Sequence, residues 1–421
     1  MSLSRRQYLA GSASAAVTAI SLAGAQFAHA QGTDETVKAI LVGCGGRGCG
    51  AAQDFLTNPN TKIIGLADVF EDRVSAAAER FGVPKEATFL GFDAYRKVLE
   101  YGKQNGAVYA LLVTPPGFRP IHYKAAVEMG YNCFLEKPIC VDAPGYRMCM
   151  DVNKMAAEKG LKVGVGMQRR HQDSYLNGVK ELWDGKIGDL ITARVYWNMG
   201  EISTRGTGEE PTEMQRQIRN RYFYVWLCGD NIVEQHVHNI DVGNWVMGKG
   251  DPNFHPVSCN CQGGREVRPR TSRWGEIFNH HACEFIYADG RRMFSQSRQM
   301  AGCWNCVNEF VDGTKGSSSV ASKGRKHNPY EQEHTDLIAA IKQNLAYHEG
   351  WQGAAAAMTG VLGRMASYSG QAISWDDAVN NGKAYMIYEN HDQLTLDSDP
   401  PVLPDENGNY RIPVPGQTKP W

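Results

Sequence analysis

The stretch from Val37 to Gly48, which reads VKAILVGCGGRG, decides the fold. Six mostly apolar residues, typical of a buried strand, run directly into a Gly-x-Gly-x-x-Gly loop ahead of a helical stretch. Gly43 allows a tight turn, Gly45 lets the backbone approach a pyrophosphate, and Gly48 lets helix pack on strand. The N-terminus of that helix would offer unpaired N–H groups to the anion. The stretch therefore predicts a dinucleotide site, with a loop made of Gly43, Gly45, Gly46, Arg47 and Gly48.

A carboxylate follows at the spacing that a ribose contact requires. Asp68 ends the next apolar run, 20 residues after Gly48. A carboxylate in this place accepts hydrogen bonds from the ribose hydroxyls and repels a 2′-phosphate. The sequence therefore predicts NAD as the cofactor. NADP is less favoured. It stays an alternative because Arg47 and Arg73 are close enough to Asp68 to offer positive charge to a 2′-phosphate.

Strand and helix patterns alternate over the first part of the chain. Apolar runs recur at 37–42, 62–67, 108–113, 132–135 and 162–165, with helical periodicity at 121–129 and 146–158. This alternation predicts βαβ units and a parallel sheet. We therefore expect an α/β protein whose residues 31–168 form a Rossmann domain with a doubly wound parallel sheet.

The pattern of apolar and polar residues changes after residue 168. Half-exposed strands are expected at 191–197, 282–288 and 291–297, and Asp289-Gly290 predicts a hairpin. Helices are expected at 335–344 and 353–368, and a polar loop at 316–326. Residues 169–399 should thus form an α+β domain with a large, mostly antiparallel open sheet. A Pro-rich tail, 400–421, should be extended along the surface.

Charge and composition exclude several classes of protein. The 421 residues carry 44 basic and 45 acidic side chains, which gives a formal net charge of −1. A nucleic-acid-binding protein usually has a basic excess, so we expect no such partner. After the N-terminal segment no apolar run is long enough to cross a bilayer, and we expect no membrane contact by the mature form.

The first thirty residues have the pattern of an export signal. Arg5-Arg6 precedes a mildly apolar run, Leu9–Ala25, and Ala28-His29-Ala30 has the form of a cleavage site. A paired arginine before a weak apolar segment is typical of the twin-arginine signal, whose machinery exports folded proteins. An ordinary secretory signal and a chance basic N-terminus are the alternatives. We expect residues 1–30 to be removed and the protein to be periplasmic.

The eleven cysteines are scattered rather than arranged as a disulfide framework. Cys303 and Cys306 have the spacing of a redox or zinc half-site, but no second Cys-x-x-Cys accompanies them. We expect the cysteines to be free thiols that pack as small apolar side chains.

Two later motifs carry a resemblance to a known family. Thr114-Pro115-Pro116 and His122 precede Glu136-Lys137-Pro138, and a second-domain motif runs from Gly229 to Asp241. Together with the glycine loop they resemble the Gfo/Idh/MocA superfamily of oxidoreductases. The resemblance implies nucleotide contacts from Thr114, Pro115, His122, Glu136 and Lys137.

The resemblance also implies catalytic roles. Lys137 would lie beside the nicotinamide and hydrogen-bond the reacting hydroxyl, and His238 would exchange the proton of that hydroxyl, as its near-neutral pKa suits. Glu234 stands where the family usually has aspartate, and His236 where it usually has glycine. A structural lysine beside Pro138 and a core histidine are the alternatives for Lys137 and His238.

Other polar side chains are candidates for substrate contact. The candidates are Arg169, Tyr222, Tyr224, His236 and Asp241. Arg169 and Arg170 could instead form interdomain ion pairs, and the tyrosines could be core residues. Glu234, His236 and His238 would share one face if the segment were a strand, with Asp241 and His280-His281 nearby. A metal site is conceivable there, but the superfamily's chemistry needs none and we expect none.

Export narrows the function that the resemblance implies. NAD is not freely recycled outside the cytoplasm, so an exported enzyme is best explained by a tightly bound cofactor. We expect an oxidoreductase that acts on a secondary hydroxyl of a sugar, glycoside or cyclitol. A redox-neutral NAD-dependent glycosidase and a non-catalytic sugar-binding protein are the alternatives. Family members are usually dimers or tetramers, which implies a homodimer or homotetramer.

Overall fold

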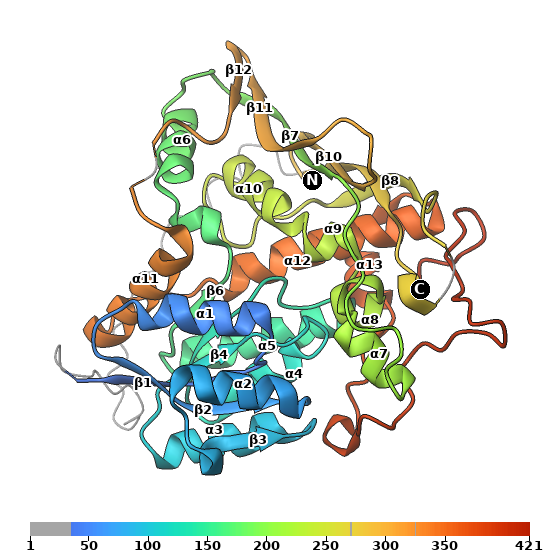
Figure 1. Cartoon of the computed structure of the whole chain (residues 1–421). Helices are drawn as coiled ribbons and strands as arrows, with labels where there is room; N and C mark the ends of the chain where they lie inside the picture. The colour runs from blue at the N-terminus through green and yellow to red at the C-terminus, as the bar shows by residue number, and fades with distance from the viewer. Residues whose placement is uncertain (1–34, 270–271, 325) are drawn as a thin grey trace, which may run out of the picture.

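The computed structural model describes residues 35–421, apart from 270–271 and 325. The expected export signal, residues 1–30, lies outside the described residues. Two sheets organise the described chain, one in the lower half of Figure 1 and one along its upper edge. The α/β fold class expected from the sequence is confirmed, with one parallel sheet and a separate, mostly antiparallel one.

The first sheet is parallel and doubly wound. Its order is β3-β2-β1-β4-β5-β6, so the chain reverses its direction of travel between β1 and β4. Ligands of such sheets bind outside the carboxyl ends of the strands at that switch point. The strands are β1 Val37–Val42, β2 Thr61–Asp68, β3 Thr88–Leu90, β4 Tyr109–Leu112, β5 Asn132–Leu135 and β6 Val163–Val165.

Helices cover this sheet and continue into the second half of the chain. In the Rossmann part they are α1 Gly46–Leu56, α2 Glu71–Phe81, α3 Ala94–Gln104, α4 Arg119–Glu128 and α5 Ala143–Glu158. The later helices are α6 Asp173–Trp183, α7 Glu213–Arg219, α8 Val225–Cys228, α9 Asn231–Glu234, α10 Val237–Met247, α11 Pro329–Gln343, α12 Gly350–Ser369 and α13 Trp375–Asn381. Helix α11 starts six residues before the expected one, because Asn328 caps it by accepting a hydrogen bond from Tyr330 N at 3.2 Å.

The second sheet has seven strands in the order β12-β11-β7-β10-β9-β8-β13. Only the β10–β7 pair is parallel, and the expected hairpin at Asp289-Gly290 joins β9 to β10. The strands are β7 Leu190–Met199, β8 Ser258–Gly264, β9 His280–Ile286, β10 Arg292–Gln299, β11 Cys306–Gly313, β12 Gly316–Ser319 and β13 Ile373–Ser374. The prediction of a polar loop at 316–326 was wrong for residues 316–319. Pairing with β11 makes residues 316–319 an edge strand despite their Gly/Ser composition.

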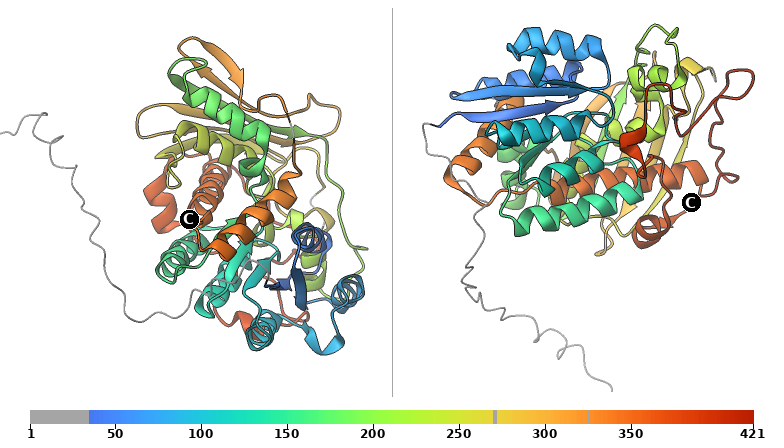
Figure 2. Two further views of the ribbon diagram at one scale, coloured as in Figure 1. Left: turned by 90° about the vertical axis from the view of Figure 1, so that its left-hand side faces the viewer. Right: turned by 90° about the horizontal axis from the view of Figure 1, so that it is seen from below.

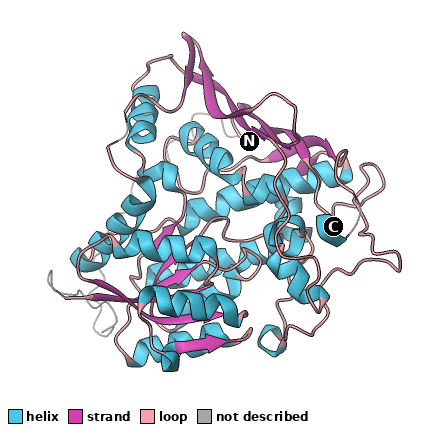
Figure 3. Ribbon diagram, in the orientation of Figure 1, coloured by secondary structure: helices cyan, strands magenta, loops and turns pink. Residues whose placement is uncertain are grey.

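One face of the second sheet is covered and the other is open. Helices α10 and α12 pack on the inner face, and the outer face carries no helix in Figure 3. On the outer face Phe294 of β10 is exposed, and Tyr196 of β7 packs against Phe310 of β11 and against the exposed Trp304 of the adjoining turn. The sheet thus presents apolar groups on both faces.

Helix α12 joins the two halves. It lies beside α5 of the Rossmann part and against β8 and β9 of the second sheet (Figure 2). Nearly all of its side chains are buried, and the run Ala354–Ala357 gives it the small surface that close packing on both sides needs. Side chains of both halves therefore form one hydrophobic cluster.

The cysteine prediction was wrong for one pair. Cys261 on β8 and Cys283 on β9 lie directly opposite each other and form a disulfide. The other nine cysteines are free, and most of them are buried. The separation of 22 residues between Cys261 and Cys283 gave no signal in the sequence, because only the strand register brings the two sulfur atoms together.

The tightest contact of the glycine loop makes a test of the fold. A Cβ at Gly48 would lie 1.8 Å from the carbonyl oxygen of Gly43, which is backbone and cannot move aside. We expect Gly48→Ala to lower the free energy of unfolding by about 1–3 kcal/mol, the usual cost of overpacking. Gly50→Ala on the same helix is the control, because its Cβ would meet only the end of the Arg47 side chain at 3.6 Å. Urea unfolding of both variants measures this; equal stabilities would contradict the argument.

Candidate active site

A cavity of about 250 Å³ opens at the switch point of the parallel sheet. Its wall contains the glycine loop, the end of β2 and the turn after β4. Of the nucleotide contacts expected from the sequence, it contains Gly43, Gly45, Gly46, Arg47, Gly48, Asp68, Arg73, Thr114, Pro115 and His122. These residues are spread over 80 positions of the chain, from Gly43 to His122. They meet because parallel strands end at one edge of the sheet.

The details of this cavity fit a dinucleotide. A Cβ at Gly45 or Gly46 would meet no atom within 4 Å, so both glycines leave open space at the N-terminus of α1. Asp68 accepts hydrogen bonds from Cys44 N at 2.7 Å and Phe70 N at 3.0 Å, which fix its carboxylate against the loop. Burial raises the pKa of Asp68, and the Arg73 guanidinium and these N–H groups oppose the rise.

The C-terminal segment closes one side of the same cavity. His391 forms part of the wall, with its ring 5.9 Å from that of His122. The next residue, Asp392, accepts hydrogen bonds from Tyr95 OH at 2.7 Å and Arg96 Nε at 2.6 Å, both on α3. The segment around Asp392 is thus attached to the Rossmann domain beside the nucleotide cavity, 350 residues after the glycine loop.

A second cavity, of about 360 Å³, adjoins the first. The two share the wall residues Gly46, Arg47, Val113, Arg205 and Arg221. The second cavity also contains Glu136, Lys137, Glu234, His238 and Tyr222. The three residues that the resemblance implied as catalytic therefore line one cavity, next to the site that fits the dinucleotide.

A buried carboxylate links the two domains in this cavity. Lys137 Nζ donates a hydrogen bond to the carbonyl oxygen of Glu234 and lies 3.6 Å from its Oε1. Arg221 donates to the same Oε1 at 3.0 Å. Burial alone would raise the pKa of Glu234, but the charges of Arg221, Lys137 and Arg119 outweigh it and hold that pKa below its usual value. Glu234 is therefore a carboxylate that orients both cations.

His238 lies in the first turn of α10, so the strand geometry considered for this segment does not form. Residues 231–234 and 237–247 form α9 and α10, so Glu234, His236 and His238 do not alternate along one strand. The ring of His238 stacks on Trp197 with centroids 5.9 Å apart. Burial, with the nearby charges of Lys137 and Arg169, lowers its pKa well below the usual value. At neutral pH His238 is uncharged and able to accept a proton.

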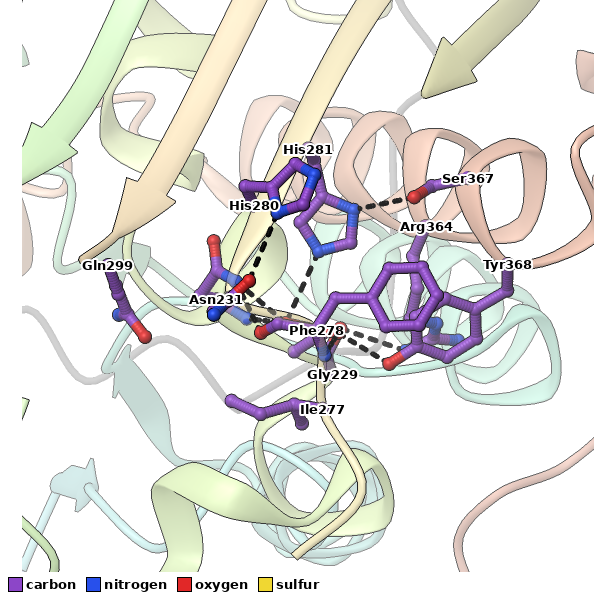
Figure 4. A network of polar contacts seen from close by, with 12 residues as sticks. Gly229, Asn231, Ile277, Phe278, His280, His281, Gln299, Arg364, Ser367 and Tyr368 are labelled. Atoms are coloured by element: carbon purple, nitrogen blue, oxygen red, sulfur yellow. Dashed lines mark hydrogen bonds and ion pairs between the residues drawn. The ribbon is translucent and has the colours of Figure 1, made fainter. Parts of the chain in front are cut away.

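A buried polar network holds the segment that carries Glu234 and His238 (Figure 4). Asp230 adopts a positive φ of 78° and caps α9. Its Oδ2 accepts hydrogen bonds from Phe278 N at 2.9 Å and from Tyr368 OH, and its Oδ1 lies 3.3 Å from His281 Nε2. The carboxylate thus fixes the start of the segment that carries Glu234 and His238 to β9 and α12.

Other candidate substrate residues lie elsewhere. Tyr224, expected to touch substrate, is buried against Tyr410, and His236 is buried with its Nε2 2.7 Å from Ser295 Oγ. Arg170 binds Asp241 through two nitrogens, each 2.8 Å from an oxygen. Arg169 pairs with Glu309 of β11. Tyr222 lines the second cavity, whereas Tyr224, His236, Arg169 and Asp241 line neither cavity. Arg169 and Arg170 do form ion pairs, but with carboxylates of the same expected domain, 169–399, so these are not the interdomain pairs considered as the alternative.

The sequence reasoning missed four polar side chains of the second cavity, namely Arg119, Arg205, Arg221 and Tyr330. Arg119 stands between Pro115 and His122 in the Rossmann part, where an isolated charge in an apolar helix start was an available signal. Tyr330 belongs to α11 and lies under the guanidinium of Arg47, 4.9 Å from ring centroid to Cζ. Its distance along the chain left no local signal.

The described residues hold no cluster of three or more His, Cys, Asp or Glu side chains that would suit a metal ion. Within the same residues no helix is long and apolar enough to cross a membrane.

Comparisons with known proteins agree with this geometry. Residues 37–167 match the Gfo/Idh/MocA family model, described as an oxidoreductase family with an NAD-binding Rossmann fold. This part of the chain is therefore similar to the NAD-binding Rossmann domain of an oxidoreductase family, and the match ends before the second sheet begins.

Individual relatives are more distant. Inositol 2-dehydrogenase of Rhizobium meliloti is 24% identical over 51% of this chain and 56% of its own, so the chain spans about half the length of this curated relative. A glycosyl hydrolase family 109 protein of Porphyromonas gingivalis is 39% identical over 16% of this chain and 15% of its own. The chain also resembles the crystal structure of apo scyllo-inositol dehydrogenase from Lactobacillus casei, with a TM-score of 0.64 at 20% sequence identity. The match covers 82% of this chain and 99% of that one, so the two proteins share the fold.

The Asp230 network predicts an acid-dependent loss of stability. The His281 ring and the hydrogen bonds from Tyr368 and Phe278 N outweigh the effect of burial and lower the pKa of Asp230. A lowered pKa in the folded state contributes stability above the unfolded pKa of about 4, and this is lost as pH falls through the folded value.

We expect Asp230→Asn to destabilise the protein by about 1.5–3 kcal/mol at pH 7, the usual worth of hydrogen bonds to a charged group. The deficit should shrink below pH 4, where the wild type loses the same charge. Asparagine tolerates the positive φ, so the backbone stays unstrained. Asp151→Asn, on the exposed side of α5, is the control. Denaturant unfolding from pH 3 to 8 measures both, and a pH-independent deficit would refute the charge argument.

Proposed function

We propose that the protein is an NAD-dependent oxidoreductase that acts on a secondary hydroxyl of a sugar, glycoside or cyclitol. One observation carries the proposal: Lys137, Glu234 and His238 meet in a cavity that adjoins the glycine-loop cavity. The similarity to inositol dehydrogenases supports a polyol as the substrate. A cavity of 360 Å³ lies near the lower end of the usual range for ligand pockets, about 300–1,000 Å³, and suits a single sugar ring.

The residues of the cavity divide the work of oxidising an alcohol. NAD, when bound, supplies the hydride acceptor. His238 takes the hydroxyl proton, because its lowered pKa keeps the ring neutral and ready to accept. The Lys137 ammonium donates a hydrogen bond to the same oxygen, and Glu234 holds it in place through the contacts already described. In the reverse direction the protonated His238 returns the proton.

NAD rather than NADP is the cofactor that we propose. The Asp68 carboxylate at the end of β2 supports this choice, since it would repel a 2′-phosphate. Two guanidinium groups near Asp68 favour NADP instead, because they could bind a 2′-phosphate. They belong to Arg73 and Arg219, whose Cζ atoms lie 4.6 and 3.9 Å from the centroid of the Phe70 ring. Arg219 is engaged by Asp72, which leaves Arg73 as the residue that NADP would need.

We further propose that the protein is exported through the twin-arginine route, is periplasmic, and keeps its NAD bound. Export of a folded protein explains how an NAD enzyme leaves the cytoplasm already loaded. The contact of Asp392 with Tyr95 and Arg96 supports retention, because the segment beside His391 must move for that side of the cavity to open. A retained cofactor requires that oxidation and reduction occur in one catalytic cycle.

A redox-neutral glycosidase is the second candidate. The similarity to family 109 glycosyl hydrolases favours it, but this covers only 16% of the chain. A sugar-binding protein without turnover is the third, and the joint presence of Lys137, Glu234 and His238 argues against it.

A homodimer or homotetramer is the proposed assembly. The exposed apolar side chains on the open face of the second sheet support it, since contiguous apolar groups on a soluble protein mark contact surfaces.

Cofactor retention is tested by denaturing the purified protein and counting the nucleotide released per chain. We expect close to one NAD(H) per chain. Asp392→Ala should lose nucleotide during dialysis, because the link to α3 is removed, whereas Asp397→Ala, an exposed residue of the same segment, should keep it. An empty wild-type protein would contradict retention, and bound NADP(H) would contradict the role given to Asp68.

The catalytic proposal is tested with Lys137→Ala. Loss of a positioned proton partner typically costs about 10²- to 10⁴-fold in rate. The readout is the change in nucleotide absorbance at 340 nm after mixing with inositols, aldoses and their methyl glycosides. Lys154→Ala, on the exposed side of α5, should behave as wild type. A wild type that binds sugars yet never changes nucleotide absorbance and cleaves no nitrophenyl glycoside would favour the non-catalytic alternative.

A further inference from the structure

The charge of the second cavity is unusual for a site that takes a neutral polyol. Five cationic side chains line it, against two carboxylates. The two carboxylates are already engaged: Glu136 accepts hydrogen bonds from Arg47 and from Lys137 N, and Glu234 pairs with Arg221 and Lys137. Arg47 also pairs with Asp54 and Glu333, outside the lining of this cavity. The positive charge that remains unpaired among the described residues is that of Arg119 and Arg205.

Part of the positive charge serves the cofactor. Arg47, Arg205 and Arg221 line both cavities, so a pyrophosphate at the glycine loop would lie near them. Arg119 lines only the second cavity. It shares that wall with Lys137 and His238, so its charge faces the substrate side.

Arg119 also has hydrogen-bonding capacity that the protein does not use. It is the first residue of α4 and only 3% exposed. One terminal nitrogen donates to the carbonyl oxygen of Pro138, directly after Lys137, while the buried Nε has no partner among the described residues. An unpaired buried N–H of a charged group costs free energy, which a ligand acceptor would recover.

The guanidinium stays charged at neutral pH. Burial lowers the pKa of Arg119 to about 10, and the carboxylates of Glu136 and Glu234 oppose the fall. A buried cation without a carboxylate in contact is costly, and the described residues offer Arg119 no ion-pair partner. Its planar fork matches a carboxylate or sulfate through two parallel hydrogen bonds.

We propose that the substrate is an anionic sugar, whose carboxylate or sulfate oxygens bind Arg119 while a ring hydroxyl faces Lys137 and His238. The proposal rests on the oxidoreductase function and narrows its substrate class. Arg119 acts in specificity, since it holds the anion and takes no part in the proton transfer.

Matched pairs of sugars test the proposal. D-Glucuronate and D-galacturonate are compared with D-glucose and D-galactose, and with the 6-sulfates of both hexoses. Calorimetry of the nucleotide-loaded protein gives binding, and absorbance at 340 nm gives turnover. We expect at least one anionic sugar to bind about tenfold or more tightly than its neutral counterpart, and the preference to shrink in 0.5 M NaCl. The uronate and sulfate arms tell the two anion sources apart.

Variants assign the preference to one side chain. Arg119→Gln should reduce binding and kcat/KM for the anionic sugar about 10- to 100-fold, mainly through KM, as loss of a charge-assisted hydrogen bond predicts. The neutral sugar should be affected little. Arg268→Gln removes another buried arginine, one that pairs with Glu201 outside both cavities, and should leave the ratio unchanged. Should Arg119→Gln fail to fold, Arg119→Lys keeps the charge without the fork and should retain part of the preference.

The outcomes separate this inference from the function that it rests on. Equal binding of anionic and neutral sugars overturns the anion site, even if both are oxidised. An equal loss for both kinds of sugar in Arg119→Gln overturns it too, because Arg119 would then serve the cofactor or the fold. Preferential anion binding without any change in nucleotide absorbance or glycoside cleavage leaves the anion site standing and overturns the oxidoreductase proposal.

Discussion

The buried Glu234 carboxylate is the interaction on which the rest of the site depends. A buried carboxylate must be paired, because desolvation of an isolated charge costs several kcal/mol. Its partners come from both domains: Lys137 lies just after β5 of the parallel sheet, and Arg221 lies just before α8. The requirement to satisfy one charge therefore fixes the two domains at the point where hydride and proton would leave the substrate.

The surroundings keep that pairing rigid. Helix α12 packs on α5 and on the second sheet, so both domains share one core and cannot separate without exposing it. Asp230 fixes the start of the segment that carries Glu234 to β9 and α12, and Asp142 caps α5 while accepting hydrogen bonds from Tyr385 N and Tyr388 OH of the C-terminal segment. A site for transfer chemistry needs this kind of support, because small displacements of the reacting groups are costly.

The two cavities divide the charges between cofactor and substrate. Arg47, Arg205 and Arg221 line both cavities, whereas Lys137, His238 and Arg119 line only the second, which is the proposed substrate cavity. Neutral His238 fits this arrangement, because burial, together with the cations around it, lowers its pKa and keeps the ring uncharged. The unpaired positive charge of Arg119 in the same cavity makes an anionic group on the substrate favourable.

The sequence by itself determined the features that depend on local pattern. The glycine spacing, the apolar runs of the parallel strands and the position of Asp68 are each encoded within a few residues, and all were found where they were expected. The tertiary structure alone decided the partners: that Glu234 binds Arg221, that Arg119 is buried in the substrate cavity, and that Cys261 faces Cys283. It also decided that residues 231–234 and 237–247 are helical and that His236 and Tyr224 belong to the core. These outcomes depend on contacts between segments far apart in the chain, which no local pattern of residues records.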